Sequence, residues 1–158
     1  DGGKTTVGIE STIIKLTKYG FQVLRNGIIT IEEIDKIVPY DKDSKIEKLA
    51  APGMLKSHYS PKKTFLIANN FTLKLDKSKS GLISFSGKLE NGFKKVIKVS
   101  MRNELKEYAV NMFEAMHTFE DDVEIDTIIA EPVNEIGIGK AIMDRLKKAE
   151  YIWKKNDL

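Results

Sequence analysis

The N-terminal part of the chain carries short runs of β-branched residues. Residues 7–16 are rich in Val, Ile and Thr, which predicts a strand with apolar side chains on both faces in places. A second short strand is predicted at residues 21–24. Thr30 is followed three residues later by Glu33, the spacing of a capping box. A short helix is therefore expected to begin there and to stop before Pro39.

Residues 62–158 alternate predicted strands with predicted helices. Asn103 is a good N-cap for a first helix, and residues 137–151 form a second helix with one apolar face. The strands are predicted from short buried runs, at residues 64–68, 81–85, 96–99 and 127–130. This alternation is typical of an α/β layer with a largely parallel sheet.

The stretch between these two regions, residues 39–61, has little periodicity and is rich in Pro. A connector longer than about 12–15 residues is usually functional or disordered, and the apolar content of this one favours an ordered, docked segment. The sequence thus divides into a first region at residues 1–38, a connector at 39–61 and an α/β domain at 62–158. Two strands and one short helix bury too little surface to make the first region self-sufficient.

Composition narrows the function classes. Of 158 residues, 41% are hydrophobic and 31% charged, as in globular domains. No run approaches the length of a membrane span, so no membrane partner is expected. The chain lacks cysteine, which excludes disulfides and thiolate chemistry and is compatible with a cytoplasmic location. The net charge of +3 is too small to imply nucleic-acid binding.

Few residues point to chemistry by their spacing. His58 and His117 have no metal-ligand spacing, so no metal site is predicted, and no catalytic residue can be assigned. Residues 71–106 carry nine basic and three acidic residues, a local charge of +6 that could attract phosphates, although a solvated strand edge explains it as well. The segment Gly137-Ile138-Gly139 could hold an anion at a helix start or serve close packing.

Several motifs resemble the longer, two-domain form of the threonylcarbamoyl-adenylate synthases. The first region resembles the end of their YrdC-like domain, and the connector and the last domain resemble the segments that follow it. The motifs occur in the family's order, and one departure is Asn26, where the family usually has Pro. They are Asp1-Gly2-Gly3, Val7-Gly8-Ile9-Glu10-Ser11-Thr12-Ile13, Leu24-Arg25-x-Gly27, Ala51-Pro52-Gly53-Met54, His58-Tyr59-Ser60-Pro61, Glu131-Pro132, Gly137-Ile138-Gly139, Ala141-Ile142 and Asp144-Arg145-Leu146.

The resemblance implies a fold and an activity. The fold would be the incomplete end of a YrdC-like α/β domain, a long connector and a small Rossmann-like α/β domain. The parent protein would be a nucleotidyltransferase that condenses ATP, L-threonine and bicarbonate into threonylcarbamoyl-AMP and releases pyrophosphate. Other tRNA-modifying proteins would use this product to modify adenosine 37 of tRNAs. Mg²⁺ is expected to accompany ATP, and the chain alone is expected to be inactive.

The resemblance also implies roles for three residues. Ser11 would contact the threonine substrate, and Arg25 and Tyr59 would contact ATP. Ser11 and Arg25 lie 14 residues apart around a predicted turn, so two adjacent strands could bring them together, with the connector crossing as a lid. Without the resemblance, these residues would be a strand serine, a surface turn arginine and a docking tyrosine. A non-catalytic RNA-binding or regulatory module, with weak tRNA contact, remains the alternative.

Overall fold

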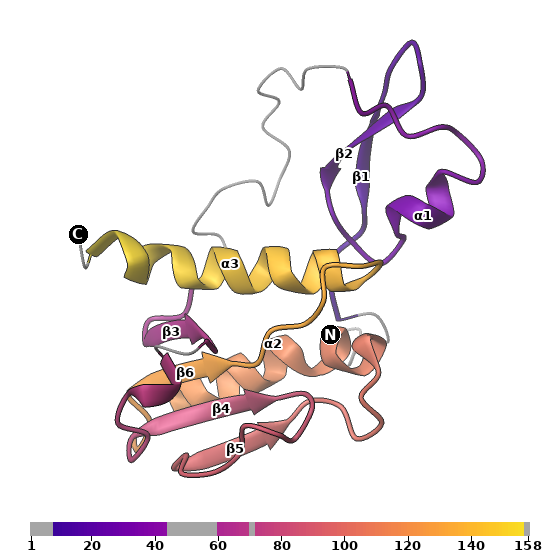
Figure 1. The fold of residues 1–158 in the computed structure, drawn as a ribbon. Helices are drawn as coiled ribbons and strands as arrows, with labels where there is room; N and C mark the ends of the chain where they lie inside the picture. Colours follow the sequence, from indigo (N-terminus) through magenta and orange to yellow (C-terminus); the bar gives the residue numbers. More distant parts are fainter. Residues whose placement is uncertain (1–7, 44–59, 70–71, 157–158) are drawn as a thin grey trace, which may run out of the picture.

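The computed structural model describes residues 8–43, 60–69 and 72–156. Its main body is a four-stranded sheet with strand order β3-β6-β4-β5 (Figure 1). The strands are β3 (Thr64–Ile67), β4 (Ser80–Ser84), β5 (Lys95–Lys98) and β6 (Thr127–Ala130), and every adjacent pair is parallel. A short 3-10 helix, η1 (Thr72–Lys74), lies between β3 and β4. This confirms the predicted α/β fold with a parallel sheet.

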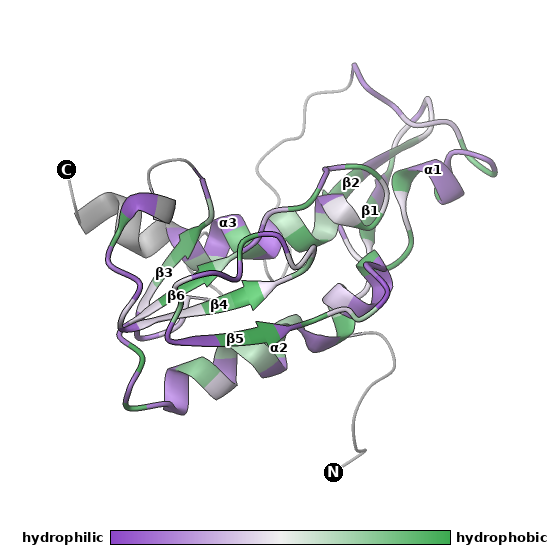
Figure 2. Ribbon diagram, turned by 60° about the horizontal axis from the view of Figure 1, so that its bottom comes forward, coloured by the Kyte–Doolittle hydropathy of each residue, from purple (hydrophilic) through white to green (hydrophobic). Residues whose placement is uncertain are grey.

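Two long helices cover the sheet, α2 (Leu105–Asp121) and α3 (Gly139–Asn156). Because side chains alternate along a strand, one face of the sheet presents Phe65, Ile83 and Ile128. These residues share one buried cluster with Met112 of α2 and Leu146 of α3. The green, apolar parts of β3, β6 and β4 therefore lie at the centre of this domain in Figure 2.

The opposite face of the sheet has a smaller core. Leu82 of β4 and Ile129 of β6 are fully buried there. Leu89 and Phe93, from the loop between β4 and β5, pack against them. A loop thus covers the face that carries no helix, which makes the domain two layers deep.

The N-terminal part forms an antiparallel hairpin of β1 (Ile13–Leu16) and β2 (Phe21–Arg25), followed by the short helix α1 (Ile31–Ile34). The predicted capping box is present: the Glu33 amide donates to the Thr30 hydroxyl, and the Thr30 amide donates to the Glu33 carboxylate. The hairpin and α1 lie beside the N-terminal end of α3 in Figure 1.

This hairpin region packs on the α/β domain. Ile9 is 6% exposed and belongs to the main core cluster. Gly8 has a φ of +65° and lies so close to α2 that an added methyl would sit 2.1 Å from the Val110 Cα. An ion pair of 2.7 Å joins Lys140 of α3 to Glu32 of α1, and this hydrogen bond is the main cause that lowers the pKa of Glu32.

Several predicted boundaries differ from those of the structure, mostly by one or two residues. The first strand begins only at Ile13, because residues 8–10 turn inward to the core. Asn103 is not the N-cap of α2: it adopts a φ of +57°, and Glu104 takes the cap position. The helix expected from residue 137 begins at Gly139.

Candidate substrate-binding site

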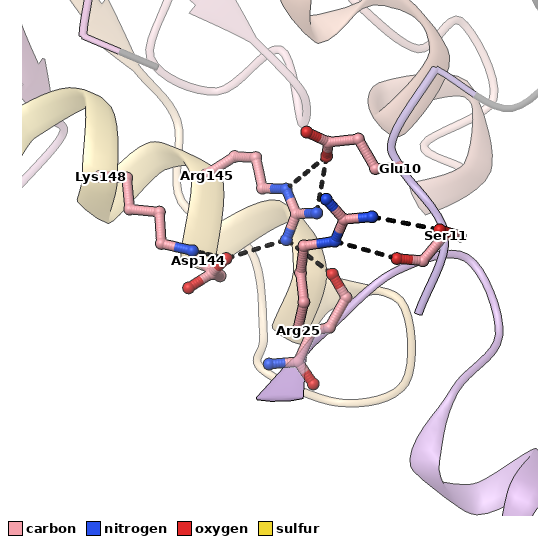
Figure 3. Close-up of polar contacts among 7 residues, drawn as sticks. Glu10, Ser11, Arg25, Asp144, Arg145 and Lys148 are labelled. Carbon is pink, nitrogen blue, oxygen red and sulfur yellow. Dashed lines mark hydrogen bonds and ion pairs between the residues drawn. The ribbon is translucent and has the colours of Figure 1, made fainter. Parts of the chain in front are cut away.

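The structure brings two of the predicted site residues together. Ser11 lies just before β1, and Arg25 ends β2. The Arg25 guanidinium donates from Nε to the Ser11 carbonyl oxygen and from one terminal nitrogen to the Ser11 Oγ, both at 3.1 Å (Figure 3). Ser11 is exposed and Arg25 half-buried, so both can be reached from solvent. A hydroxyl that accepts from Arg25 can still donate its own proton to a ligand.

Local backbone geometry makes this contact. The hairpin register shifts between Ile13, which pairs with Arg25, and Ile14, which pairs with Val23. A register shift of this kind bends a strand and redirects the side chains beside it. The turn after Arg25 then presses Gly27 against the Ser11 segment, where an added methyl would lie 2.4 Å from the Ser11 carbonyl carbon. Glycine is required at Gly27 by this close approach.

A second arginine contacts the chain neighbours of Ser11 and Arg25. Arg145 of α3 is fully buried. Its Nε and Nη2 donate to Glu10 Oε2 at 3.1 and 2.7 Å, and its Nη1 donates to the Asn26 carbonyl oxygen at 2.6 Å and to Asp144 Oδ2 at 2.8 Å (Figure 3). A buried guanidinium is tolerated only when it is paired and hydrogen-bonded in this way.

Sequence reasoning missed the roles of Glu10 and Arg145. A signal was present: Arg145 lies four residues from both Ala141 and Ala149, on the apolar face of its helix. A charged residue at such a position requires a buried partner. The identity of the partner could not be inferred, because Glu10 lies 135 residues away in the chain.

Tyr59, the third predicted site residue, lies outside the described residues, as does most of the connector. The next residue, Ser60, donates its hydroxyl to the Lys148 carbonyl oxygen at 3.0 Å. Lys148 in turn bonds Asp144 at 2.7 Å, one turn earlier in α3. The C-terminal end of the connector therefore lies against α3, the helix that carries Arg145.

Two cavities lie between the hairpin region and α3. They measure about 450 and 310 Å³ and share Ile31 and Lys140. The smaller cavity is lined by Asn26, Ile31, Glu135, Lys140, Asp144 and Lys147. Asn26 and Asp144, which both accept hydrogen bonds from Arg145, therefore line the smaller cavity. Neither cavity is lined by Ser11 or Arg25.

The helix start at Gly137-Ile138-Gly139 does not present its amides to a ligand. The amides of Gly139, Lys140 and Ala141 donate to the carbonyl groups of residues 136–138. A methyl at Gly139 would lie 2.0 Å from the Asn134 carbonyl oxygen. Close packing therefore explains this glycine.

The described part of the chain holds no group of three or more His, Cys, Asp or Glu side chains that could bind a metal ion. Carboxylates are the usual protein ligands of Mg²⁺, together with the substrate phosphates. Among residues 8–43, 60–69 and 72–156, no helix combines the length and apolar character needed to cross a membrane.

The fold places carboxylates against part of the basic stretch at residues 71–106. Lys95 of β5 contacts Asp122 at 2.6 Å and Glu124 at 2.9 Å, and Lys94 contacts Glu124 at 3.0 Å. The hydrogen bonds that Lys95 donates, first to Asp122 and then to Glu124, raise the pKa of Lys95. These carboxylates follow α2 and lie outside the stretch, so the local charge counted along the sequence overstates the field. This weakens the RNA-binding alternative.

The fold and the site thus define a small parallel α/β domain that carries an appended hairpin with a Ser–Arg pair. A sequence model of the threonylcarbamoyl-AMP synthase C-terminal domain matches residues 29–150. The chain therefore belongs to the threonylcarbamoyl-AMP synthase family and is homologous to the C-terminal half of its members.

Individual relatives agree with this assignment. Threonylcarbamoyl-AMP synthase of Pyrococcus abyssi is 31% identical and aligns with 94% of this chain, and that of Bacillus subtilis is 30% identical over the same share. The crystal structure of P. abyssi Sua5 complexed with L-threonine superposes with a TM-score of 0.74 at 30% identity, covering 96% of this chain and 48% of that one. A P. abyssi Sua5 variant with an adjacent His and Tyr replaced by Ala gives 0.73.

The chain spans about half the length of the curated relatives it matches, 48% for the P. abyssi protein and 47% for the B. subtilis protein.

Proposed function

We propose that this chain is the C-terminal part of an L-threonylcarbamoyladenylate synthase acting in the t6A modification of tRNA. The observation that carries the proposal is the Ser11–Arg25 contact, which pairs a hydroxyl with a guanidinium beside solvent. Family membership supports it, as does the fact that a related protein of similar fold was crystallised with L-threonine. The parent protein would work in the cytoplasm and pass its product to other tRNA-modifying proteins.

The reaction needs positioning more than acid–base catalysis. The threonine amine attacks the bicarbonate carbon, water leaves, and a carbamate forms. A carbamate oxygen then attacks the α-phosphorus of ATP, and the bond to pyrophosphate breaks. Because the carbamate is unstable in water, the site must hold the three substrates together and exclude solvent.

Ser11 and Arg25 suit two of these tasks. The exposed Ser11 hydroxyl would hydrogen-bond L-threonine. The guanidinium of Arg25 presents five donors in a planar fork, so it can contact Ser11 and also approach a phosphate oxygen of ATP. Mg²⁺ accompanying ATP would neutralise phosphate charge, a task for which the described residues offer no ligand cluster.

Tyr59 would complete the nucleotide site from the connector. The chain contains one adjacent His-Tyr pair, His58-Tyr59. An adjacent His-Tyr pair was the target of the alanine substitutions in the solved P. abyssi variant. Replacing Tyr59 by Ala is expected to raise the KM for ATP more than the KM for threonine. Equal effects on both constants would remove Tyr59 from the ATP site.

The main test uses pyrophosphate release by the full-length protein with ATP, L-threonine and bicarbonate. Arg25→Ala should lower kcat/KM for ATP about 10- to 150-fold, because a hydrogen bond to a charged group is worth about 1.5–3 kcal/mol. Arg102→Ala, a matched arginine on the β5–α2 loop, should leave it unchanged. The 158-residue chain alone should release no pyrophosphate. Unchanged kinetics in Arg25→Ala, or turnover by the chain alone, would show that the site is misplaced.

A further inference from the structure

The contacts around Arg145 form a closed circuit, which runs from Arg145 through Glu10, Ser11, Arg25 and Asn26 back to Arg145. Arg145 holds Glu10, the residue before Ser11, and it holds the carbonyl group of Asn26, the residue after Arg25. Arg25 closes the circuit through its two hydrogen bonds to Ser11. Figure 3 draws both guanidinium groups with their hydrogen-bond partners, one from α3 and one from the hairpin.

The geometry of the circuit demands an arginine. The buried side chain must reach a carboxylate, a main-chain carbonyl oxygen and Asp144 in three directions, which a planar fork of fixed donors can do. A lysine is a compact point charge with three donors on one nitrogen and cannot span the same acceptors. Asp144 is itself held by Lys148, with a contact of 2.7 Å, so one side of the fork is anchored within α3.

We propose that Arg145 is a positioning residue. From its place on α3 in the α/β domain, Arg145 sets the distance between Ser11 and Arg25. Its two partners outside α3 lie in the segments before β1 and after β2, so α3 acts on both halves of the site at once. The inference rests on the proposed function for the roles of Ser11 and Arg25. The coupling between Arg145 and the Arg25 side chain can be measured independently of that function.

The first measurement uses the arginine side chains of the 158-residue chain. It contains three arginines, Arg25, Arg102 and Arg145, so the three Nε–H signals can be assigned by nitrogen-15 NMR. In Arg145→Lys, the Nε–H of Arg25 should exchange with water at least tenfold faster, because its bond to the Ser11 carbonyl group is loosened. The Nε–H of Arg102 donates to Glu107 at 2.9 Å and should not change.

A control variant tests whether the effect is specific to Arg145, and a second variant replaces Arg145→Lys if that protein does not fold. Arg102→Lys should leave the Arg25 signal as it is in the unaltered chain. If Arg145→Lys does not fold, Glu10→Gln removes the charge of the partner instead, at a side chain that is 33% exposed. It should accelerate exchange at Arg25 in the same way. Unchanged exchange at Arg25 in a folded variant of either kind would overturn the proposal.

The second measurement is steady-state kinetics of pyrophosphate release by the full-length protein. Arg145→Lys should raise the KM for L-threonine and for ATP at least tenfold. A purely structural role would lower the fraction of active protein, which reduces kcat and leaves KM unchanged, and that result would also overturn the proposal. If the unaltered full-length protein makes no threonylcarbamoyl-AMP, the proposed function fails, and the exchange of the Arg25 Nε–H still decides whether Arg145 positions it.

Discussion

Replacing Gly27 by Ala tests the site through its tightest backbone contact. The added methyl would lie 2.3 Å from the Thr12 nitrogen and 2.4 Å from both the Glu10 oxygen and the Ser11 carbonyl carbon. Ordinary contact begins at 3.4 Å, so the turn must retreat by about 1 Å. All three atoms are backbone, so no rotamer change can relieve the clash.

This displacement of the turn should increase the distance between Arg25 and Ser11. It should lower the free energy of unfolding only modestly. Overpacking costs about 1–3 kcal/mol of unfolding free energy. A misplacement of about 1 Å at a site can cost about 100-fold in rate, so kcat/KM for pyrophosphate release by the full-length protein should fall about 100-fold. Urea unfolding of the 158-residue chain measures the first effect separately from the second.

Gly92→Ala is the matched control. Gly92 has a φ of +87°, and its nearest neighbour for an added methyl is a flexible lysine atom at 3.6 Å. The substitution should cost about 1–2 kcal/mol through backbone strain alone and leave the kinetics unchanged. The reasoning is refuted if Gly27→Ala retains the original kinetics, or if Gly92→Ala impairs them equally.

Two further predictions concern stability, measured by urea unfolding of the 158-residue chain. Tyr108 is fully buried, and its hydroxyl donates to the Glu131 carbonyl oxygen at 2.8 Å, so Tyr108→Phe should lower the unfolding free energy by about 1–3 kcal/mol; an unchanged midpoint would contradict this. Hydrogen bonds from Ser100 and then Arg102 lower the pKa of Glu107 from 4.5 to about 2. Because the folded pKa is depressed, the stabilisation is complete above about pH 4.5 and is lost as the pH falls toward 2. Glu107→Gln should flatten the pH dependence of stability in that window, and an unchanged slope there would refute this assignment.

Local signals in the sequence located the elements that depend on local physics. The run at Thr127–Ala130 has the bounds that the sequence predicts, because a short run rich in β-branched residues between polar neighbours favours a buried strand. The capping box at Thr30 and Glu33 was predicted because its partners are three residues apart. The parallel sheet followed from the alternation of strands and helices.

The prediction from local signals is wrong at the loop before α2, because side chains within the loop and the first turn of α2 set its path. Asn103 has the side chain of a good N-cap, yet the loop is organised by Glu107, whose carboxylate accepts from Ser100 Oγ at 2.7 Å and from the Met101 amide at 3.0 Å. The Glu104 amide donates to the Ser100 hydroxyl, and Asn103 takes the left-handed conformation that this path requires. Asn tolerates that conformation better than most residues, which explains its presence there.

The contact of Ser11 with Arg25 could be anticipated, whereas its support by α3 could not. The two residues flank a hairpin, so a turn between adjacent strands brings their segments close to each other. Arg145 reaches Glu10 from α3, a helix that lies against β3, so this contact depends on the tertiary arrangement of α3 and the hairpin region. A site residue whose partners are more than 100 positions away leaves only one trace in the sequence, a charge on an apolar helix face.

The buried charge of Arg145 on α3 bears on how the hairpin region and the α/β domain depend on each other. The α/β domain has an apolar cluster on each face of its sheet, and Arg145 belongs to neither cluster. Replacing a buried ionic group by an apolar residue is often neutral or stabilising. An arginine that is fully buried and directs its donors to Glu10 and Asn26 is therefore better explained by the placement of the hairpin than by the stability of the domain that carries it.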